Sequence, residues 1–249
     1  MKAMMFAAGR REKLRPLTER IPKALVPVAG RPMIEYPLLL LRHYGIREII
    51  INLHHLGEQI EAYLGNGKQF GIDIIYSKEP ELLDTGGGLL KAKPFLERET
   101  FIVINTDVMI DLPLAELIAF HKKTQATATL VLRPDPNADR FGSMEIDSDG
   151  RIYRFLNARR QPGVSAPGRK LMFTGVQILE PRIFDYMHGA SGPRKFGTTK
   201  DTYPQMLVEG ERLYGFCFEG LWQDLGTPDR IKEVEEALAQ GRARLHYLQ

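Results

Sequence analysis

Short apolar segments of strand length alternate along this chain with segments whose apolar residues recur at helical spacing. Such alternation is typical of a parallel sheet that is covered on both faces by helices. Strands are predicted at residues 2–7, 47–52, 72–76, 101–105, 126–132, 170–179 and 212–218. Helices are predicted at residues 32–44, 56–64, 88–96, 114–124, 182–187, 203–208 and 228–239.

The pattern changes after the fifth predicted strand. Residues 142–146 and 151–156 flank the turn-forming segment 147–150, which predicts a β-hairpin. Residues 157–169 are mostly polar and are broken by two prolines and two glycines, which predicts a flexible loop. Because there is no internal repeat and no long linker, a single domain is expected over residues 1–249.

Composition excludes several protein classes. Apolar residues make up 43% and charged residues 26% of the chain, which is close to the globular average and unlike a disordered protein. Every apolar run is far shorter than the ~18 residues that span a bilayer, and the N-terminal run is too short for a secretory signal. The single cysteine, Cys217, fits a reducing compartment. A cytoplasmic protein without a membrane partner is expected.

The basic residues are concentrated at the start of the chain. Residues 1–33 hold eight basic and two acidic residues, a net charge of +6, although the whole chain carries only +3. This local excess favours an anion site over a nucleic-acid surface, for which a basic stripe along a face or a helix is expected. The alternative is a surface loop whose charges are solvated.

The first predicted strand ends in the turn Ala7-Ala8-Gly9. Ligands of open α/β sheets bind at the carboxyl ends of the strands, where a glycine lets backbone N–H groups approach a phosphate. The spacing GxGxxG and the Walker A lysine motif are both absent, so neither a dinucleotide fingerprint nor a P-loop is present.

Three later segments also carry candidate chemistry. Asp107 follows a buried strand, where a carboxylate can hold Mg²⁺ or can cap the next element. Asp224 precedes Thr227 and Pro228, which read as the N-cap and first residue of the last helix. The glycines at 86–88 allow close approach of a flat or anionic ligand, or simply form a flexible turn.

Taken in order, the motifs of this chain resemble those of the sugar-1-phosphate nucleotidyltransferases, and the resemblance runs from residue 1 to about 240. Among the branches of that family the chain is most similar to short bacterial N-acetylmuramate-1-phosphate uridylyltransferases and to mannose- or heptose-1-phosphate guanylyltransferases. The motifs are Ala7-Ala8-Gly9, Leu14-Arg15-Pro16-Leu17-Thr18, Ile21-Pro22-Lys23, Val26-Pro27-Val28-Ala29-Gly30-Arg31-Pro32, Thr85-Gly86-Gly87-Gly88, Asn105-Thr106-Asp107, Phe173-Thr174-Gly175 and Trp222-Gln223-Asp224-Leu225-Gly226-Thr227.

The resemblance implies a Rossmann-like α/β fold: a mixed, mostly parallel sheet flanked by helices, with a small β-rich sugar-binding lobe. It implies a nucleotide-binding half at 1–135, a sugar-binding part at 136–220, and a metal motif with the closing helix at 221–249. The implied reaction is transfer of a nucleotidyl group from an NTP, UTP or GTP, to a sugar-1-phosphate, with release of pyrophosphate. The enzyme would use magnesium, act in cell-envelope polysaccharide synthesis, and exist as a monomer or small homo-oligomer.

The same resemblance assigns roles to individual residues. Lys23 and Lys13 correspond to positions that contact the reacting phosphates, and Asp107 and Asp224 to the pair that holds Mg²⁺. The implied nucleotide-binding residues are Ala8, Gly9, Arg11, Glu79, Thr85, Gly86 and Gly87, and the implied sugar-binding residues are Gly142, Thr174 and Gly175.

The first loop departs from the family pattern Gly-x-Gly-x-Arg at two positions. Arg11 replaces the second glycine and Lys13 replaces the arginine, so a bidentate fork becomes a point charge. Loss of such a contact costs on the order of 1.5 to 3 kcal/mol, or about 10- to 100-fold in rate or affinity. Arg10, Arg11 and Lys13 together can restore the positive charge at the triphosphate. The alternative is a catalytically weakened or inactive homologue that binds nucleotide-sugars and has a regulatory role.

Overall fold

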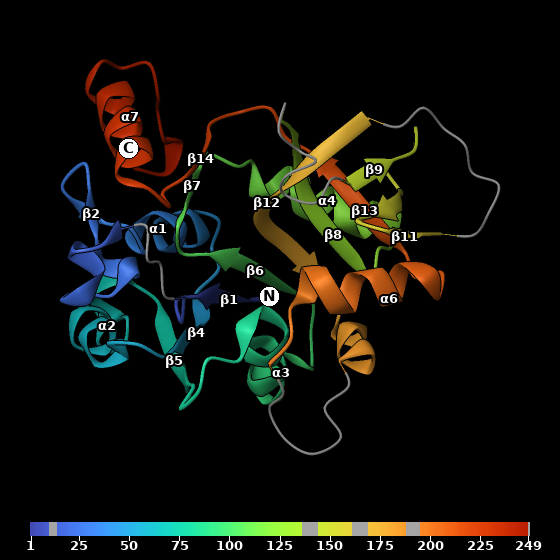
Figure 1. The fold of residues 1–249 in the computed structure, drawn as a ribbon, viewed down its shortest axis with the longest axis horizontal. Helices are drawn as coiled ribbons and strands as arrows, with labels where there is room; N and C mark the ends of the chain where they lie inside the picture. The colour runs from blue at the N-terminus through green and yellow to red at the C-terminus, as the bar shows by residue number, and fades with distance from the viewer. Residues whose placement is uncertain (10–13, 136–143, 161–168, 188–194, 249) are drawn as a thin grey trace. The chain divides into compact units, whose positions relative to one another are not determined.

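A computed structural model describes residues 1–9, 14–135, 144–160, 169–187 and 195–248 (Figure 1). The chain forms two units, which are described separately. Unit 1 comprises Met1–Leu82, Ile104–Leu112 and Gly220–Gln249, and unit 2 comprises Leu83–Val103 and Pro113–Glu219. Among the described residues, no helix combines the length and the apolar character needed to cross a bilayer.

Unit 1 contains the parallel strands β1 (Lys2–Phe6), β4 (Glu48–Leu53) and β5 (Asp73–Lys78). β4 lies between the other two, with Ala3 opposite Ile49 and Ile49 opposite Ile74. The middle residues of β1 and β4 are fully buried, as expected for parallel strands covered on both faces. Because the strands are parallel, their carboxyl ends lie at one edge, and the loops that follow them are neighbours.

The helices of unit 1 lie where the sequence pattern predicts them, and the largest difference is at the start of α1. The helix predicted to open at Pro32 begins only at Glu35, because Arg31–Pro32 form a short strand, β3, that pairs with β2. The N-cap prediction at Thr227 is confirmed, since its side chain accepts from the Arg230 backbone N–H at 3.4 Å. The helices are α1 (Glu35–His43), α2 (Gly57–Leu64) and α7 (Pro228–Ala239), with 3-10 helices η2 (Leu17–Glu19), η3 (Lys23–Leu25), η4 (Lys68–Phe70) and η7 (His246–Leu248).

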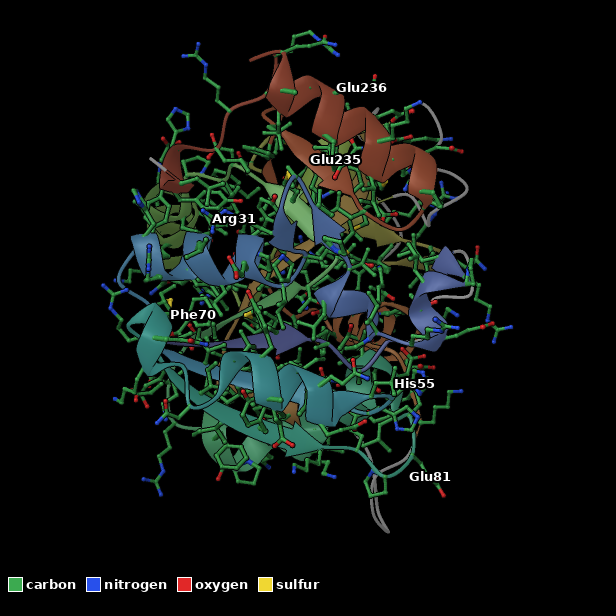
Figure 2. All side chains as sticks on the ribbon, turned by 90° about the vertical axis from the view of Figure 1, so that its left-hand side faces the viewer. Arg31, His55, Phe70, Glu81, Glu235 and Glu236 are labelled. Atoms are coloured by element: carbon green, nitrogen blue, oxygen red, sulfur yellow. The ribbon has the colours of Figure 1, made fainter. Side chains whose placement is uncertain are left out.

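Two short pairings in unit 1 are absent from the prediction. β2 (Pro27–Val28) and β3 (Arg31–Pro32) form a hairpin. In the turn of this hairpin, the Ala29 backbone N–H donates at 2.8 Å to Glu235 of α7, which is labelled in Figure 2. β7 (Val108–Ile110) and β14 (Trp222–Asp224) pair antiparallel, with Asp224 opposite Val108. Strands of two or three residues carry no detectable alternation, so periodicity cannot predict them.

Unit 2 is built on β8, which pairs in parallel with β13 and antiparallel with β12. β12 continues through three further antiparallel neighbours, and the hairpin predicted around residues 147–150 is confirmed as β9 and β10. The strands are β8 (Ala128–Pro134), β9 (Met144–Ile146), β10 (Ile152–Phe155), β11 (Ala158–Arg159), β12 (Arg169–Leu179) and β13 (Leu213–Cys217). Residues 161–168 of the predicted loop lie outside the described residues.

In unit 2 the helix predicted from residue 88 starts at Asp84, so the glycine run 86–88 is helical. The segment predicted as a helix at 182–187 is a 3-10 helix. The helices are α3 (Asp84–Leu96), α4 (Leu114–Thr124), α6 (Tyr203–Val208), the 3-10 helix η5 (Pro181–Tyr186) and the π-helix η6 (Thr198–Thr202).

The strand β6 (Phe101–Asn105) has its first three residues in unit 2 and its last two in unit 1. The sheet is mixed and flanked by helices, which confirms the predicted fold class. The two units are groupings of residues and do not test the functional division at 135 and 220, which stays a prediction.

Candidate functional site

The first loop begins at Ala7, directly after β1, at the carboxyl edge of the unit 1 sheet. Hydrogen bonds from two sides hold the backbone at the position where this loop begins. On one side, the Thr106 hydroxyl donates to Phe6 O at 2.8 Å. On the other side, the Ala7 backbone N–H donates to Asn52 Oδ1 at 2.8 Å. Since Thr106 follows β6 and Asn52 lies near the end of β4, the loop starts from a backbone position fixed by two neighbouring strands.

Gly9 occupies the open part of this loop. The residue is exposed, and a Cβ built on it would meet no protein atom within 4 Å. Nothing in the described chain therefore requires glycine here, whereas a ligand that approaches the backbone closely would require it. Ala8, its neighbour, is buried. The contacts of Ala8 and Gly9 with a nucleotide stay predictions.

Lys23 is a buried cation, with only 8% of the residue exposed. Pro22 holds an extended backbone directly before it, so that Lys23 opens the 3-10 helix η3. Its ammonium group forms an ion pair with Asp107 Oδ2. The structure therefore brings together two residues that the sequence placed in separate motifs, and it pairs the buried charge as physical chemistry requires.

Asp107 and Asp224 lie on adjoining backbone segments. The Leu225 backbone N–H donates to Asp107 O at 2.9 Å, which continues the pairing of β7 with β14. Asp107 lies in the turn before the strand β7, so a role as a helix cap is wrong, whereas a role in the turn stays open. Asp224 accepts from the Arg230 guanidinium of α7 at 2.5 Å. Within the described part of the chain, each carboxylate therefore contacts a basic side chain.

The donor set at these segments fits a magnesium ion that is also held by substrate. Mg²⁺ prefers oxygen ligands and is usually bound by one or two carboxylates together with water and substrate phosphates. Asp107 and Asp224 supply two carboxylates on neighbouring strands. Among the described residues there is no group of three or more potential metal-binding side chains, so an all-protein metal cage is not found there.

Glu79 lies directly after β5 and is buried, with 4% of the residue exposed. Its Oε1 accepts from the Asn52 side-chain amide at 2.8 Å, and its backbone N–H donates to Leu53 O at 2.7 Å. Sequence reasoning singled out Glu79 and missed Asn52. A polar residue near the carboxyl end of an otherwise apolar strand was the signal that could have found it.

The predicted nucleotide-binding residues Thr85, Gly86 and Gly87 belong to unit 2, where another segment engages them. The N–H groups of Gly86 and Gly87 donate to Phe196 O at 2.9 and 3.2 Å, and the Thr198 N–H donates to the Thr85 hydroxyl oxygen at 3.0 Å. A Cβ on Gly86 would lie 2.3 Å from the Phe196 ring. The glycine therefore has a packing role in unit 2, and nucleotide contact stays a prediction.

The predicted sugar-binding pair Thr174 and Gly175 lies in an irregular part of β12. The pairing with β8 shifts register between Phe173 and Gln177, and Gly175 takes a φ of +88°, which favours glycine. The Thr174 hydroxyl donates to Val131 O at 2.9 Å and so stabilises the bulge. Bulges are frequent beside active sites, where they redirect side chains.

Three further predicted site residues cannot be compared with the structure. Arg11 and Lys13 of the first loop, and Gly142 before β9, lie outside the described residues. Their assigned contacts with phosphate and sugar stay predictions.

The family model described as nucleotidyl transferase matches residues 2–241. A UTP-glucose-1-phosphate uridylyltransferase of Synechocystis is 32% identical over 255 residues; the match covers 96% of this chain and 64% of that protein. An N-acetylmuramate alpha-1-phosphate uridylyltransferase of Neisseria meningitidis is 37% identical over 240 residues, covering 94% of this chain and 97% of that protein.

A solved structure supports the same fold. The chain superposes with a TM-score of 0.83 on the crystal structure of a Bacillus anthracis protein named a putative glucose-1-phosphate thymidylyltransferase. The two share 21% sequence identity, and the match covers 99% of this chain and 98% of that one. At this identity the likeness concerns the fold alone.

Proposed function

Because this chain belongs to the nucleotidyl transferase family, we propose that it transfers a nucleotidyl group from an NTP to a sugar-1-phosphate. The observation that carries the proposal is the Lys23–Asp107 ion pair, with Asp224 on the adjoining segment. These residues belong to the same unit as the first loop and place a buried cation against one carboxylate, with a second carboxylate on the adjoining strand. Nucleotidyl transfer requires this combination of positioning and charge neutralisation.

In the proposed reaction, a phosphate oxygen of the sugar-1-phosphate attacks the α-phosphorus of the NTP. The bond between that phosphorus and the oxygen bridging to the β-phosphate breaks, and pyrophosphate leaves with the bonding electrons. Asp107 and Asp224 would hold Mg²⁺, which supplies neutralisation and orientation of the phosphates when it is bound. Lys23 would donate to phosphoryl oxygens whose charge grows in the transition state.

The basic partners of the two carboxylates have a defined part in this proposal. Lys23 holds Asp107, and Arg230 holds Asp224, each through a direct contact. On substrate binding, the Lys23 ammonium would move from the Asp107 carboxylate to a substrate phosphate. The buried cation would thus exchange one anionic partner for another and would not be left unpaired. Arg230 would loosen its contact with Asp224 in the same way, because a bound cation would take over the neutralisation of that carboxylate.

The proposed nucleotide is UTP or GTP, and the names of two relatives favour UTP. The proposed acceptor is a sugar-1-phosphate of the kind used in cell-envelope polysaccharide synthesis, and a cytoplasmic location is proposed with it. Supporting this assignment, the chain matches a uridylyltransferase of N. meningitidis over 97% of that protein's length.

The test is a pyrophosphate-release assay with UTP, GTP, dTTP, CTP or ATP, together with Mg²⁺ and a panel of sugar-1-phosphates. Pyrophosphate should appear only when an NTP and a sugar-1-phosphate are both present. Asp224→Asn should remove this activity, whereas Asp229→Asn should retain it, because Asp229 is an exposed residue in the first turn of α7. Release without sugar-1-phosphate would indicate an NTP hydrolase and would contradict the proposal.

A regulatory homologue is the second candidate, and the replacement of the family glycine and arginine by Arg11 and Lys13 favours it. Such a protein would bind nucleotide-sugar but release no pyrophosphate. Titration calorimetry with a nucleotide-sugar, run beside the pyrophosphate assay on the same sample, distinguishes the two candidates.

A further inference from the structure

The carboxylate of Asp224 forms an ion pair with an arginine of the helix that follows it in the chain. Arg230 Nη1 lies 2.5 Å from Asp224 Oδ2, and the two side chains are 37% and 20% exposed, respectively. Because water still reaches both groups, an ion pair of this kind contributes little to the stability of the fold. Stability alone therefore does not account for the pair.

Asp224 does not need Arg230 to hold its position. Its backbone belongs to β14, which pairs with β7, and the N–H of the next residue, Leu225, donates to Asp107 O at 2.9 Å. The backbone of Arg230 is held separately, because its N–H donates to the hydroxyl oxygen of Thr227 at 3.4 Å. The contact between the two side chains therefore supplies charge and is not required for position.

Helix stability would not select an arginine at residue 230. Arg230 is the third residue of α7 and lies in its first turn, where the positive end of the helix dipole disfavours a basic side chain. An acidic residue is favoured in this turn, and the neighbouring Asp229 follows that preference. The placement of Arg230 is better explained by the counter-charge that it gives to Asp224.

The two ion pairs of the site oppose the binding of a metal ion that arrives alone. Asp107 and Asp224 carry two negative charges, while Lys23 and Arg230, each in contact with one of them, carry two positive charges. Free Mg²⁺ would have to displace a basic side chain and leave that charge without its partner. A nucleoside triphosphate removes this obstacle, because its phosphates are new anionic partners for the displaced cations.

We propose that Arg230 is a built-in counter-ion of Asp224 that keeps free Mg²⁺ from the two carboxylates, so that the metal binds tightly only together with the nucleoside triphosphate. This inference rests on the proposed function, because it assumes that Asp107 and Asp224 hold the metal. It extends that function to the order in which metal and nucleotide bind. Because linkage is reciprocal, the nucleotide must raise the affinity for the metal by the same factor by which the metal raises the affinity for the nucleotide.

Three variants test this role of Arg230, with Mn²⁺ as the probe. Arg230→Gln removes the charge of the guanidinium, and Arg230→Lys retains a positive charge. Arg230→Gln/Asp224→Asn also removes the carboxylate, and it therefore shows whether a gain in Mn²⁺ affinity arises at Asp224. Arg242→Gln is the matched control, because Arg242 is an exposed arginine of the same unit and its Nε donates to Gln240 Oε1 at 2.7 Å. Circular dichroism of each variant establishes that it is folded.

The readout is the concentration of free Mn²⁺, measured by electron paramagnetic resonance while each protein is titrated without nucleotide. A second titration contains UTP or GTP, whichever the protein binds more tightly, and no sugar-1-phosphate. Because the nucleotide itself binds Mn²⁺, a titration of the nucleotide without protein is the reference. Neither titration requires turnover.

Without nucleotide, Arg230→Gln should bind Mn²⁺ about 5- to 20-fold more tightly than wild type, because one carboxylate has lost its counter-charge. Arg230→Lys and Arg242→Gln should stay within about threefold of wild type, and Arg230→Gln/Asp224→Asn should lose the gain. The nucleotide should raise the Mn²⁺ affinity of wild type at least about tenfold, and the rise should be smaller in Arg230→Gln.

Four results would overturn the inference: an Mn²⁺ affinity of Arg230→Gln no higher than that of wild type, an equal gain in Arg242→Gln, a gain that persists when Asp224 is also replaced, or a wild-type affinity for Mn²⁺ that nucleotide does not raise. A merely structural role for Arg230 would lower the melting temperature of Arg230→Gln without tightening the binding of Mn²⁺.

Failure of the proposed function is seen separately. If Arg230 competes with Mn²⁺ in a protein that releases no pyrophosphate, the proposed function is wrong and the inference stands. If pyrophosphate is released and Arg230→Gln leaves the Mn²⁺ affinity unchanged, the inference alone is wrong. If neither Mn²⁺ nor nucleotide binds, both are wrong.

Discussion

Lys23 and Asp107 form a partly buried ion pair that joins residues 84 positions apart in the chain. Their side chains are only 7% and 13% exposed. Burying two charges carries a desolvation cost, so a hydrophobic pair of similar size would often be at least as stable. Retention of a charged pair at the carboxyl edge of a parallel sheet is therefore better explained by chemistry than by stability.

The first prediction concerns this pair. Asp107→Asn should lower the rate of pyrophosphate release at least about 100-fold, because a metal-binding carboxylate is replaced by a neutral amide. It should also lower the free energy of unfolding by about 1 to 3 kcal/mol, because the buried Lys23 ammonium loses its counter-charge. Steady-state kinetics and urea denaturation measure the two effects.

The double variant Lys23→Met/Asp107→Leu separates stability from function. It removes both buried charges, so it should recover most of the unfolding free energy lost in Asp107→Asn and none of the activity. Activity in Asp107→Asn close to that of wild type would show that this carboxylate does not take part in the reaction.

Two glycines should respond in opposite ways to the same substitution. Gly86→Ala should lower the free energy of unfolding by about 1 to 3 kcal/mol, because the new Cβ would lie 2.3 Å from the Phe196 ring and 2.9 Å from its carbonyl oxygen. Gly9→Ala should leave stability unchanged, because its Cβ would meet no protein atom within 4 Å. It should instead weaken nucleotide binding about 10- to 100-fold by displacing the phosphate from the backbone.

Chemical denaturation and nucleotide titration of both variants check this contrast. Unchanged nucleotide affinity in Gly9→Ala would mean that no phosphate approaches the first loop closely. Unchanged stability in Gly86→Ala would mean that residues 196–198 are not packed against the start of α3.

Much of the fold follows from periodicity in the sequence. The strand of residues 101–105 and the helix of residues 228–239 have the predicted bounds, because long apolar runs and a Thr-Pro start signal dominate locally. The predicted start of α3 is wrong, because three glycines favour a turn. In the structure, Phe196, which is distant in sequence, accepts from the N–H groups of Gly86 and Gly87, and its ring packs against Gly86. Such a tertiary effect leaves no local signal.

The candidate site was predictable only in part, for the same reason. Lys23, Asp107 and Asp224 are members of motifs, and only the family resemblance paired the two carboxylates in advance. The short ladder of β7 and β14 that places them on adjoining strands has no alternation by which it could be predicted. Asn52 and Arg230 are visible only as partners of other residues. A residue whose role is to hold a neighbour cannot be recognised before the neighbour's position is known.

The departures in the first loop lead to a third prediction. Arg11→Gly/Lys13→Arg should raise kcat/KM about 10- to 100-fold, because a bidentate fork replaces a point charge on the triphosphate. Lys68→Arg is the control for this kind of substitution, since Lys68 is an exposed residue that pairs with Asp73. Kinetics with no gain over wild type would show that the existing basic residues already supply the required charge.

The fourth prediction concerns pH and stability in unit 2. His121 is buried, with Nδ1 2.8 Å from Thr129 Oγ1 and Nε2 3.0 Å from Glu180 Oε1. Burial lowers the pKa of His121 below its ordinary 6.5, and the opposing effect of Glu180 is smaller. As the pH is lowered through the unfolded pKa of 6.5, the unfolded chain therefore takes up a proton at His121 before the native chain does. The free energy of unfolding decreases until the pH is below the lowered native pKa as well.

His121→Gln retains hydrogen-bonding groups but cannot titrate. Its melting temperature should fall less than that of wild type between about pH 7.5 and about pH 5.5. Parallel slopes for the two proteins over that interval would show that His121 does not contribute to acid sensitivity.

The most direct test of the central claim is a ³¹P NMR spectrum of the wild-type protein incubated with UTP, Mg²⁺ and a sugar-1-phosphate, repeated with GTP. The resonances of one NTP and of the sugar-1-phosphate should be replaced by those of pyrophosphate and a nucleoside diphosphate-sugar, in equal amounts. Inorganic phosphate in place of pyrophosphate, or an unchanged spectrum in a sample that binds nucleotide-sugar, would contradict the proposed nucleotidyl transfer.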